Sequence, residues 1–223
     1  MRRLRDNSLS LAFLLLFLAA LFGQSLAGLR DLNEEQLAHG GEAISYGRYL
    51  VSSDFGVAVL ENWQSEYLQF FLFIFATIWF VQRGSNESKR TDKIGWESDE
   101  EQQVGEFARP DSPRWAKAAG WRRHLYSNSL LLVMGLIFLG SWFGQSVTGW
   151  RTYNADQRAH QEPTVSWAPY LTRPDFWERS FQNWQSEFLA IGTMAAFTIY
   201  LRQRGSPESK PVGAPNDETA SSG

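Results

Sequence analysis

The sequence contains an internal repeat. A shift of 121 positions aligns residues 7–89 of this 223-residue chain with residues 128–210 without a gap, and 37 of the 83 aligned residues are identical. The stretch Asn-Trp-Gln-Ser-Glu at 62–66 recurs unchanged at 183–187, whereas the apolar residues 67–81 match at only 3 of 15 positions. Lipid-facing positions need only be apolar, so this pattern predicts two copies of one membrane unit.

The first apolar run, residues 9–27, is long enough to cross a bilayer, which takes about 20 residues. A cleaved signal peptide is the alternative, because the start is basic and Ser25-Leu26-Ala27 is similar to a cleavage site. The counterpart at 128–148 lies in mid-chain and cannot be a signal peptide, which favours a retained helix. Further helices are expected over 54–81 and 175–201, with Asp54 and Asp175 as N-caps.

These patterns predict an all-α membrane protein of four transmembrane helices, built as two tandem two-helix repeats with a parallel pseudo-twofold axis. The first repeat is residues 7–89 and the second is residues 128–210. A cytoplasmic linker, 90–127, joins them, and the tail, 211–223, is expected to be disordered. Residues 28–53 are expected to form a polar loop outside the membrane, and 149–174 its counterpart.

The distribution of basic residues predicts the orientation. Fifteen of the 21 Lys and Arg residues lie in the start, the central loop and the tail. The positive-inside rule therefore places both termini and the central loop in the cytoplasm. Residues 115–123, with Lys117, Trp121 and Arg122, are expected to lie on anionic lipid headgroups.

Several repeated polar residues are candidates for a ligand or ion site. Glu66 and Glu187 would bind a proton or cation if they faced the helix bundle, or would be hydrated at headgroup level. Asn62 and Glu66 are four residues apart and share a helix face, as do Asn183 and Glu187.

The remaining candidates each have two interpretations. His39 and His160 are either metal ligands, alone or together with the glutamates, or surface loop residues. Trp63 and Trp184 are interfacial anchors or stack on a ring-bearing ligand. Gln24 and Gln145 are expected to bond across helices. The repeated stretch Arg-Gly-Ser-x-Glu-Ser-Lys, at 83–89 and 204–210, exceeds what a helix C-cap requires and suggests a partner contact.

The shared stretches Asn-Trp-Gln-Ser-Glu, Phe-Gly-Gln-Ser and Gln-Arg-Gly-Ser-x-Glu-Ser-Lys resemble those of a family of functionally uncharacterised bacterial integral-membrane proteins. The resemblance covers residues 5 to about 215 and implies a multi-pass protein of the bacterial inner (plasma) membrane. It implies no activity, substrate or cofactor.

Composition limits the functions that remain. The chain has no Cys and a net charge of -3, so a thiolate metal site and nucleic-acid binding are not expected. We expect a non-enzymatic protein that binds a membrane or envelope partner, with the lipid bilayer and a second copy of the chain as further partners. A small-ligand, proton or metal-ion protein is the alternative, and a membrane enzyme using the same residues is the third.

Overall fold

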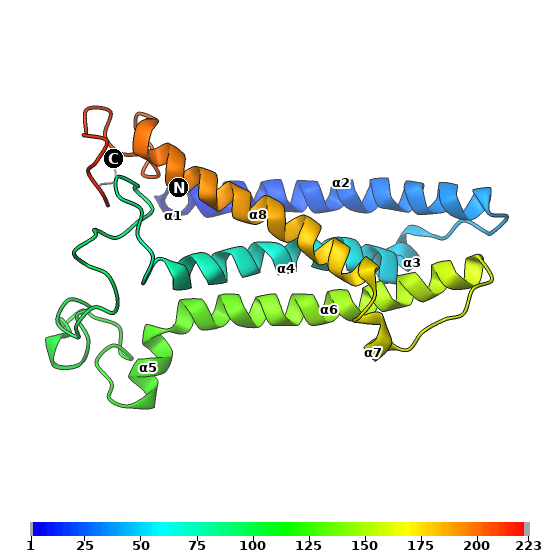
Figure 1. Cartoon of the computed structure of the whole chain (residues 1–223), viewed down its shortest axis with the longest axis horizontal. Coiled ribbons are helices and arrows are strands. Elements are labelled where there is room, and N and C mark those ends of the chain that lie inside the picture. Colours follow the sequence, from blue (N-terminus) through cyan, green and yellow to red (C-terminus); the bar gives the residue numbers. More distant parts are fainter. Residues whose placement is uncertain (1, 221–223) are drawn as a thin grey trace. The chain divides into compact units, whose positions relative to one another are not determined.

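The computed structural model describes residues 2–220, and every regular element in that range is a helix. Figure 1 shows long helices joined by shorter elements. The long helices are α2 (Ser8–Ala38), α4 (Ser53–Ala76), α6 (Ser129–Ala159) and α8 (Pro174–Tyr200). The short elements are α1 (Arg2–Asp6), α3 (Tyr46–Leu50), the 3-10 turn η1 (Gly105–Phe107), α5 (Trp121–Ser127) and α7 (Trp167–Tyr170).

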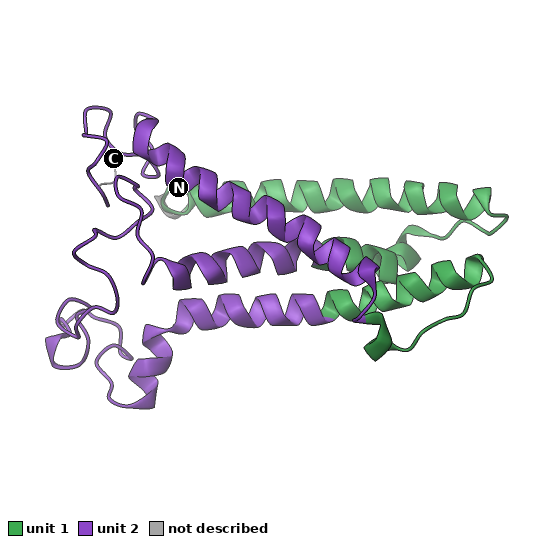
Figure 2. Cartoon of the chain, in the orientation of Figure 1, with its two compact units in different colours: residues 1–60, 144–170 green, residues 61–143, 171–223 purple. Residues whose placement is uncertain are grey.

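The chain divides into two compact units that do not follow chain order (Figure 2). Unit 1 contains residues 1–60 and 144–170, and unit 2 contains residues 61–143 and 171–223. Helices α4 and α6 contribute residues to both units. Each unit therefore combines corresponding segments from the two halves of the sequence.

Two helices, α2 and α6, are long and apolar enough to cross a membrane. Very little of either apolar stretch is buried within the protein. Along α2 the large side chains of Leu9, Phe13 and Leu15 are each more than 60% exposed. A core helix of a soluble protein would bury these side chains, so their exposure fits lipid rather than water.

Both long apolar helices continue well beyond the ends that the sequence predicted. The predicted loop 28–53 is wrong in its first part, because α2 runs to Ala38, and α6 likewise runs to Ala159. Helix α2 extends through residues of high helix propensity, such as Glu34, Glu35 and Gln36. The first loop is residues 39–49, and the second loop is residues 160–170. The first loop begins where Gly40 takes a positive φ of 76°.

The predicted N-caps of α4 and α8 are also wrong. Ser52, not Asp54, accepts the early backbone N–H of Phe55, at 3.2 Å. At α8 the cap position is Arg173, and Asp175 lies within the helix, 3.2 Å from Arg179. Proline at the first helical position, Pro174, explains the shift, because its fixed φ suits that place.

The predicted end of α4 at residue 81 is five residues too late. The helix stops at Ala76, within a run of β-branched and aromatic residues that lowers helix propensity. The carbonyl of Ile78 instead accepts the N–H of Gly95, at 2.8 Å, which ties the end of the helix to the central loop. The ends of α8 match the predicted 175–201 to within one residue.

Candidate functional site

In unit 1 the two loops are fixed by matching asparagine contacts. The side chain of Asn33 donates to the carbonyl of Ile44 at 3.1 Å and accepts its N–H at 2.7 Å. Asn154, 121 positions later, makes the same pair of bonds with Val165, at 2.8 and 2.9 Å. Each loop is therefore closed onto the end of its own long helix by a two-bond clamp.

A second matched contact uses buried serines. Ser25 and the hydroxyl of Tyr46 lie 2.8 Å apart, and the indole N–H of Trp167 donates to Ser146 at 3.1 Å. Tyr46 and Trp167 occupy equivalent positions, so the ring type has changed while a polar contact to serine is kept. Both serines are buried, where an unpaired hydroxyl would be costly.

Two buried tyrosines complete the loop anchors. Tyr49 packs against Gly28, where a side chain would overlap the tyrosine hydroxyl, and Tyr170 packs against Gly149 in the same way. Burial, followed by the nearby carboxylate of Asp54, raises the pKa of Tyr49 above its ordinary value. The Tyr49 phenol therefore stays protonated at neutral pH, and both tyrosines act in packing.

Unit 1 also contains four residues singled out from the sequence. His39 and His160 directly follow α2 and α6, and their rings lie 6.3 Å apart in an edge-on arrangement. Gln24 donates to the carbonyl of Ala58 at 3.4 Å. Gln145 is only 1% exposed, and neither polar atom of its side chain has a hydrogen-bond partner among the described residues.

In unit 2 the repeated Asn-Trp-Gln-Ser-Glu stretches contact each other unequally. The indole N–H of Trp184 donates to the side-chain oxygen of Gln64 at 2.7 Å, and Gln64 is completely buried. The equivalent Gln185 is exposed, and Trp63 is 37% exposed. Trp184 thus supports a contact between helices α4 and α8, which the sequence did not predict.

The same region brings two of the candidate acids together. The Glu187 carboxylate lies beside the Ser65 hydroxyl and close enough to Glu66 for their charges to interact. Gln69 donates to the backbone carbonyl of Glu187 at 3.0 Å. Glu66 is exposed and Glu187 half-buried. The serine of each stretch bonds the carbonyl three residues before it, as Ser65 does with Asn62.

The aromatic cluster beside this stretch was not singled out from the sequence. The Trp142 ring packs against Phe138, Phe176, Trp177 and Trp184, with ring centroids 5.7–6.1 Å apart. No regular spacing along one helix indicates this cluster, because its residues come from two helices, α6 and α8. It holds the Trp184 ring in place for its bond to Gln64.

The two Arg-Gly-Ser-x-Glu-Ser-Lys stretches adopt the same loop in unit 2. Ser88 accepts the N–H of Gln82 at 2.8 Å, and Ser209 accepts that of Gln203 at 2.9 Å. Lys210 is 1% exposed, and the three N–H groups of its ammonium are shared among four backbone carbonyl oxygens at 2.7–3.2 Å, including that of Gly84. These contacts supply a structural reason for repeating the whole stretch, beyond a C-cap.

The glutamates of these two loops face one another. Burial and the neighbouring carboxylate of Glu208 raise the pKa of Glu87. Ionised carboxylates cannot donate, so their contact becomes a hydrogen bond only when one carboxyl holds a proton. Asn86 also donates to the carbonyl of Pro207 at 3.3 Å, which links the loops a second time.

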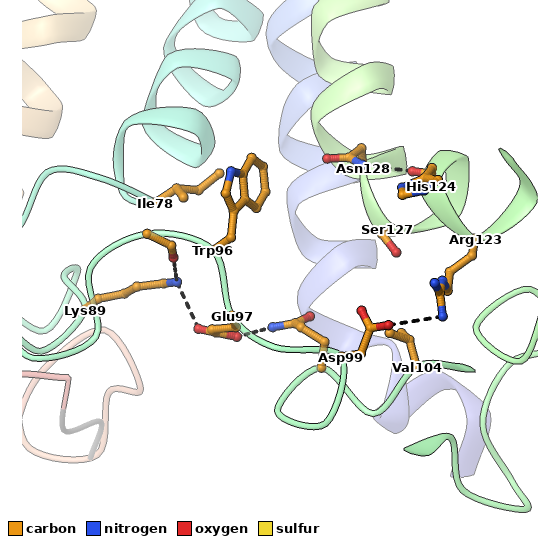
Figure 3. A pocket seen from close by; sticks show the side chains of 12 residues that line it. Ile78, Lys89, Trp96, Glu97, Asp99, Val104, Arg123, His124, Ser127 and Asn128 are labelled. Carbon is orange, nitrogen blue, oxygen red and sulfur yellow. Dashed lines mark hydrogen bonds and ion pairs between the residues drawn. The ribbon is translucent and has the colours of Figure 1, made fainter. Parts of the chain in front are cut away.

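Unit 2 contains a cavity of about 550 Å³ that the sequence did not reveal (Figure 3). Two ion pairs line the cavity: Lys89 with Glu97 at 2.9 Å, and Arg123 with Asp99 at 3.2 Å. Ile78 and Trp96 form an apolar side, and His124 and Asn128 line the rest. The volume suits a small molecule. The charges balance, so the cavity selects neither a cation nor an anion by net charge.

A family model described as a domain of unknown function (DUF6766) matches residues 1–221. The chain belongs to the DUF6766 family. No curated protein and no solved structure matches it. The expected membership of an uncharacterised family over nearly the whole chain is confirmed, while the bacterial origin stays a prediction.

A second pocket in the DUF6766 chain, of about 500 Å³, is strongly cationic. Its lining includes Arg114, Lys117 and Arg122 and no acidic residue. Trp115 and Trp121 stack edge-on at 6.3 Å, and the Arg122 guanidinium lies 5.6 Å from the Trp121 ring centre. This pocket falls in the segment predicted to lie on anionic headgroups.

The described part of the DUF6766 chain has no group of three or more His, Cys, Asp or Glu placed to hold a metal ion. His39 and His160 lie in unit 1, whereas Glu66 and Glu187 lie in unit 2. The structure thus describes these candidates as two pairs, one within each unit.

Proposed function

We propose that this DUF6766 protein is a four-span protein of the bacterial inner membrane that acts without catalysis, by binding a partner protein through its two outer loops. The matched internal bonding of the loops carries the proposal. The repeated polar residues Asn33, Asn154, Ser25 and Ser146 are engaged in loop closure. Because the polar groups of these side chains are already paired within the protein, the residues maintain the shape of the loops rather than take part in a reaction.

Membrane insertion is supported by the exposed apolar surfaces of α2 and α6. Helices α4 and α8 contain 24 and 27 residues, about 36 and 40 Å at 1.5 Å per residue, against a hydrocarbon core of about 30 Å. The polar Asn-Trp-Gln-Ser-Glu stretches inside these helices lower their mean hydropathy. As spans, they return the chain to the cytoplasmic side after each outer loop.

Rigid outer loops suit partner binding because a preformed surface loses little conformational entropy on association. Apolar side chains are left exposed at both borders of the first loop: Val51, just after α3, is 85% exposed, and Leu37, in the last turn of α2, is 60% exposed. Beside a loop held in water these side chains favour a partner protein with an apolar patch.

A photo-crosslinking amino acid placed at Val51 or Leu37 in intact cells tests the proposal. We expect one discrete adduct of the same mass from both sites. Thr91, in the central loop, serves as the control and should not give that adduct. The proposal is wrong if neither outer-loop site gives a discrete adduct, or if Thr91 gives the same one.

A second candidate function, proton or cation handling, is favoured by the proximity of Glu66 and Glu187. Paired carboxylates inside a membrane protein commonly mark an ion path. Purified protein in liposomes would then support a flux of protons or alkali cations that the paired Gln variants abolish. A proton or cation flux equal to that of empty liposomes would exclude this second function.

A further inference from the structure

The two histidines of unit 1 occupy equivalent positions that the fold brings together. His39 and His160 are 121 residues apart, yet their rings lie 6.3 Å apart with an interplanar angle of 67°. Both side chains are exposed at the start of their loops. The chain contains only three histidines, so two of them form this pair.

Each imidazole is oriented by the same backbone bond. Nδ1 of His39 lies 2.9 Å from the carbonyl oxygen of Glu35, and Nδ1 of His160 lies 2.9 Å from that of Asp156. A carbonyl can only accept, so Nδ1 is the donor in each contact, and in the neutral ring Nε2 then carries the lone pair. Metal-binding histidines show this arrangement, in which one nitrogen donates to a carbonyl and the other binds the ion.

The backbone holds both rings in the same way. Gly40 and Gln161, the residues that follow the histidines, have positive φ angles of 76° and 57°. Gly41 and Glu162 then donate back to α2 and α6, both at 2.7 Å. Such a turn closes a helix C-terminus. The two imidazoles therefore project from rigid helix ends.

We propose that His39 and His160 together bind one late first-row transition-metal ion, such as Zn²⁺, through their Nε2 atoms. Imidazole suits Zn²⁺, Cu²⁺ and Ni²⁺, whereas Mg²⁺ and Ca²⁺ require oxygen ligands. With two protein ligands, water fills the remaining positions, so the ion exchanges readily. Bound metal bridges the first and second loops and stabilises the surface proposed above for partner binding.

Calorimetric titration of the full chain in detergent with Zn²⁺ tests this site, using protein purified through a tag without histidine. We expect one Zn²⁺ per chain and a rise in melting temperature. A single His39→Ala or His160→Ala change should weaken binding by about tenfold or more, because even loss of a ligand's outer partner costs that much. The double variant should not bind. His124→Ala is the matched control and should bind as the wild type does.

The proximity of the two positions has its own test. The chain has no Cys, so a His39→Cys/His160→Cys variant carries only the two introduced thiols. A short bismaleimide should join them within one chain, while a His39→Cys/His124→Cys variant should not be joined. The site is overturned if wild type does not bind Zn²⁺, if the double alanine variant binds it equally, or if the first cysteine pair is not joined. These outcomes do not depend on whether a partner protein binds the loops.

Discussion

The indole N–H of Trp184 donates to the side-chain oxygen of Gln64 at 2.7 Å, and Gln64 is completely buried. Both residues belong to the same five-residue stretch, one in each copy. The bond therefore joins the two halves of the sequence across helices α4 and α8. It gives Trp184 a structural task that membrane anchoring does not require.

Replacing Trp184 with Phe should destabilise the fold by about 1–3 kcal/mol, because it leaves a buried amide oxygen unpaired. A Gln64→Leu/Trp184→Phe double variant should recover much of that loss, since both polar partners are gone. Gln185→Leu, at the equivalent exposed position, is the control and should change stability little. Unfolding in detergent measures all three. The assigned role is contradicted if Trp184→Phe is as stable as the wild type, or if the double variant is less stable than Trp184→Phe alone.

Gly28→Ala should loosen the first loop, because the added methyl group overlaps the Tyr49 hydroxyl. Gly23→Ala on the same helix meets nothing within 4 Å and should be neutral or stabilising, given the higher helix propensity of alanine. Removing the hydroxyl in Gly28→Ala/Tyr49→Phe should restore part of the stability. Proteolysis of the first loop reports the effect. Equal resistance in Gly28→Ala and Gly23→Ala would exclude a close Tyr49 contact.

The Glu87–Glu208 contact predicts a pH effect. A carboxyl whose pKa is raised in the folded state holds its proton longer there than in the unfolded chain. The stabilisation is therefore present at low pH and is lost as pH rises through the folded pKa. Glu87→Gln should raise the melting temperature near neutral pH and flatten its pH dependence. Glu100→Gln, on an exposed carboxylate, should do neither. A pH profile unchanged by Glu87→Gln would contradict the contact.

The cationic pocket predicts a preference for anionic lipid. Native mass spectrometry of the full chain should show phosphatidylglycerol retained over phosphatidylcholine, since Arg114, Lys117 and Arg122 surround the pocket without a carboxylate in its lining. Neutralising the three to Gln should remove that preference. Arg83→Gln/Arg90→Gln/Arg204→Gln removes the same charge elsewhere and should keep it. A preference that survives the pocket variant would place lipid selection outside the pocket.

Much of the helical framework follows from local sequence. The apolar runs locate α2 and α6, and Pro174 locates the start of α8. The sequence predicts α2 and α6 to be shorter than they are, because residues 28–38 and 149–159 are polar and polar stretches of this length are typical of loops. Their polarity marks exposure to water rather than the end of the helix, and these two helices end where Gly40 and Gln161 take positive φ.

The contacts of the candidate sites could not be predicted in the same way. The bond between Gln64 and Trp184 and the approach of His39 to His160 join residues about 120 positions apart. Periodicity along one helix carries no information about which face meets another helix. The repeat did indicate which residues matter, because Asn33 and Asn154, identical at the 121-residue spacing, make identical bonds.

The central claim is that four helices cross the membrane, so that both loops face outward and the central loop inward. Single cysteines at Ser45, Ser166 and Thr91 in this cysteine-free chain can be exposed, in intact cells, to a maleimide that does not cross the membrane. The account predicts labelling at Ser45 and Ser166, with Thr91 labelled only after the cells are opened. Equal labelling of Ser45 and Thr91 in intact cells would contradict it, because α4 would then not cross the membrane.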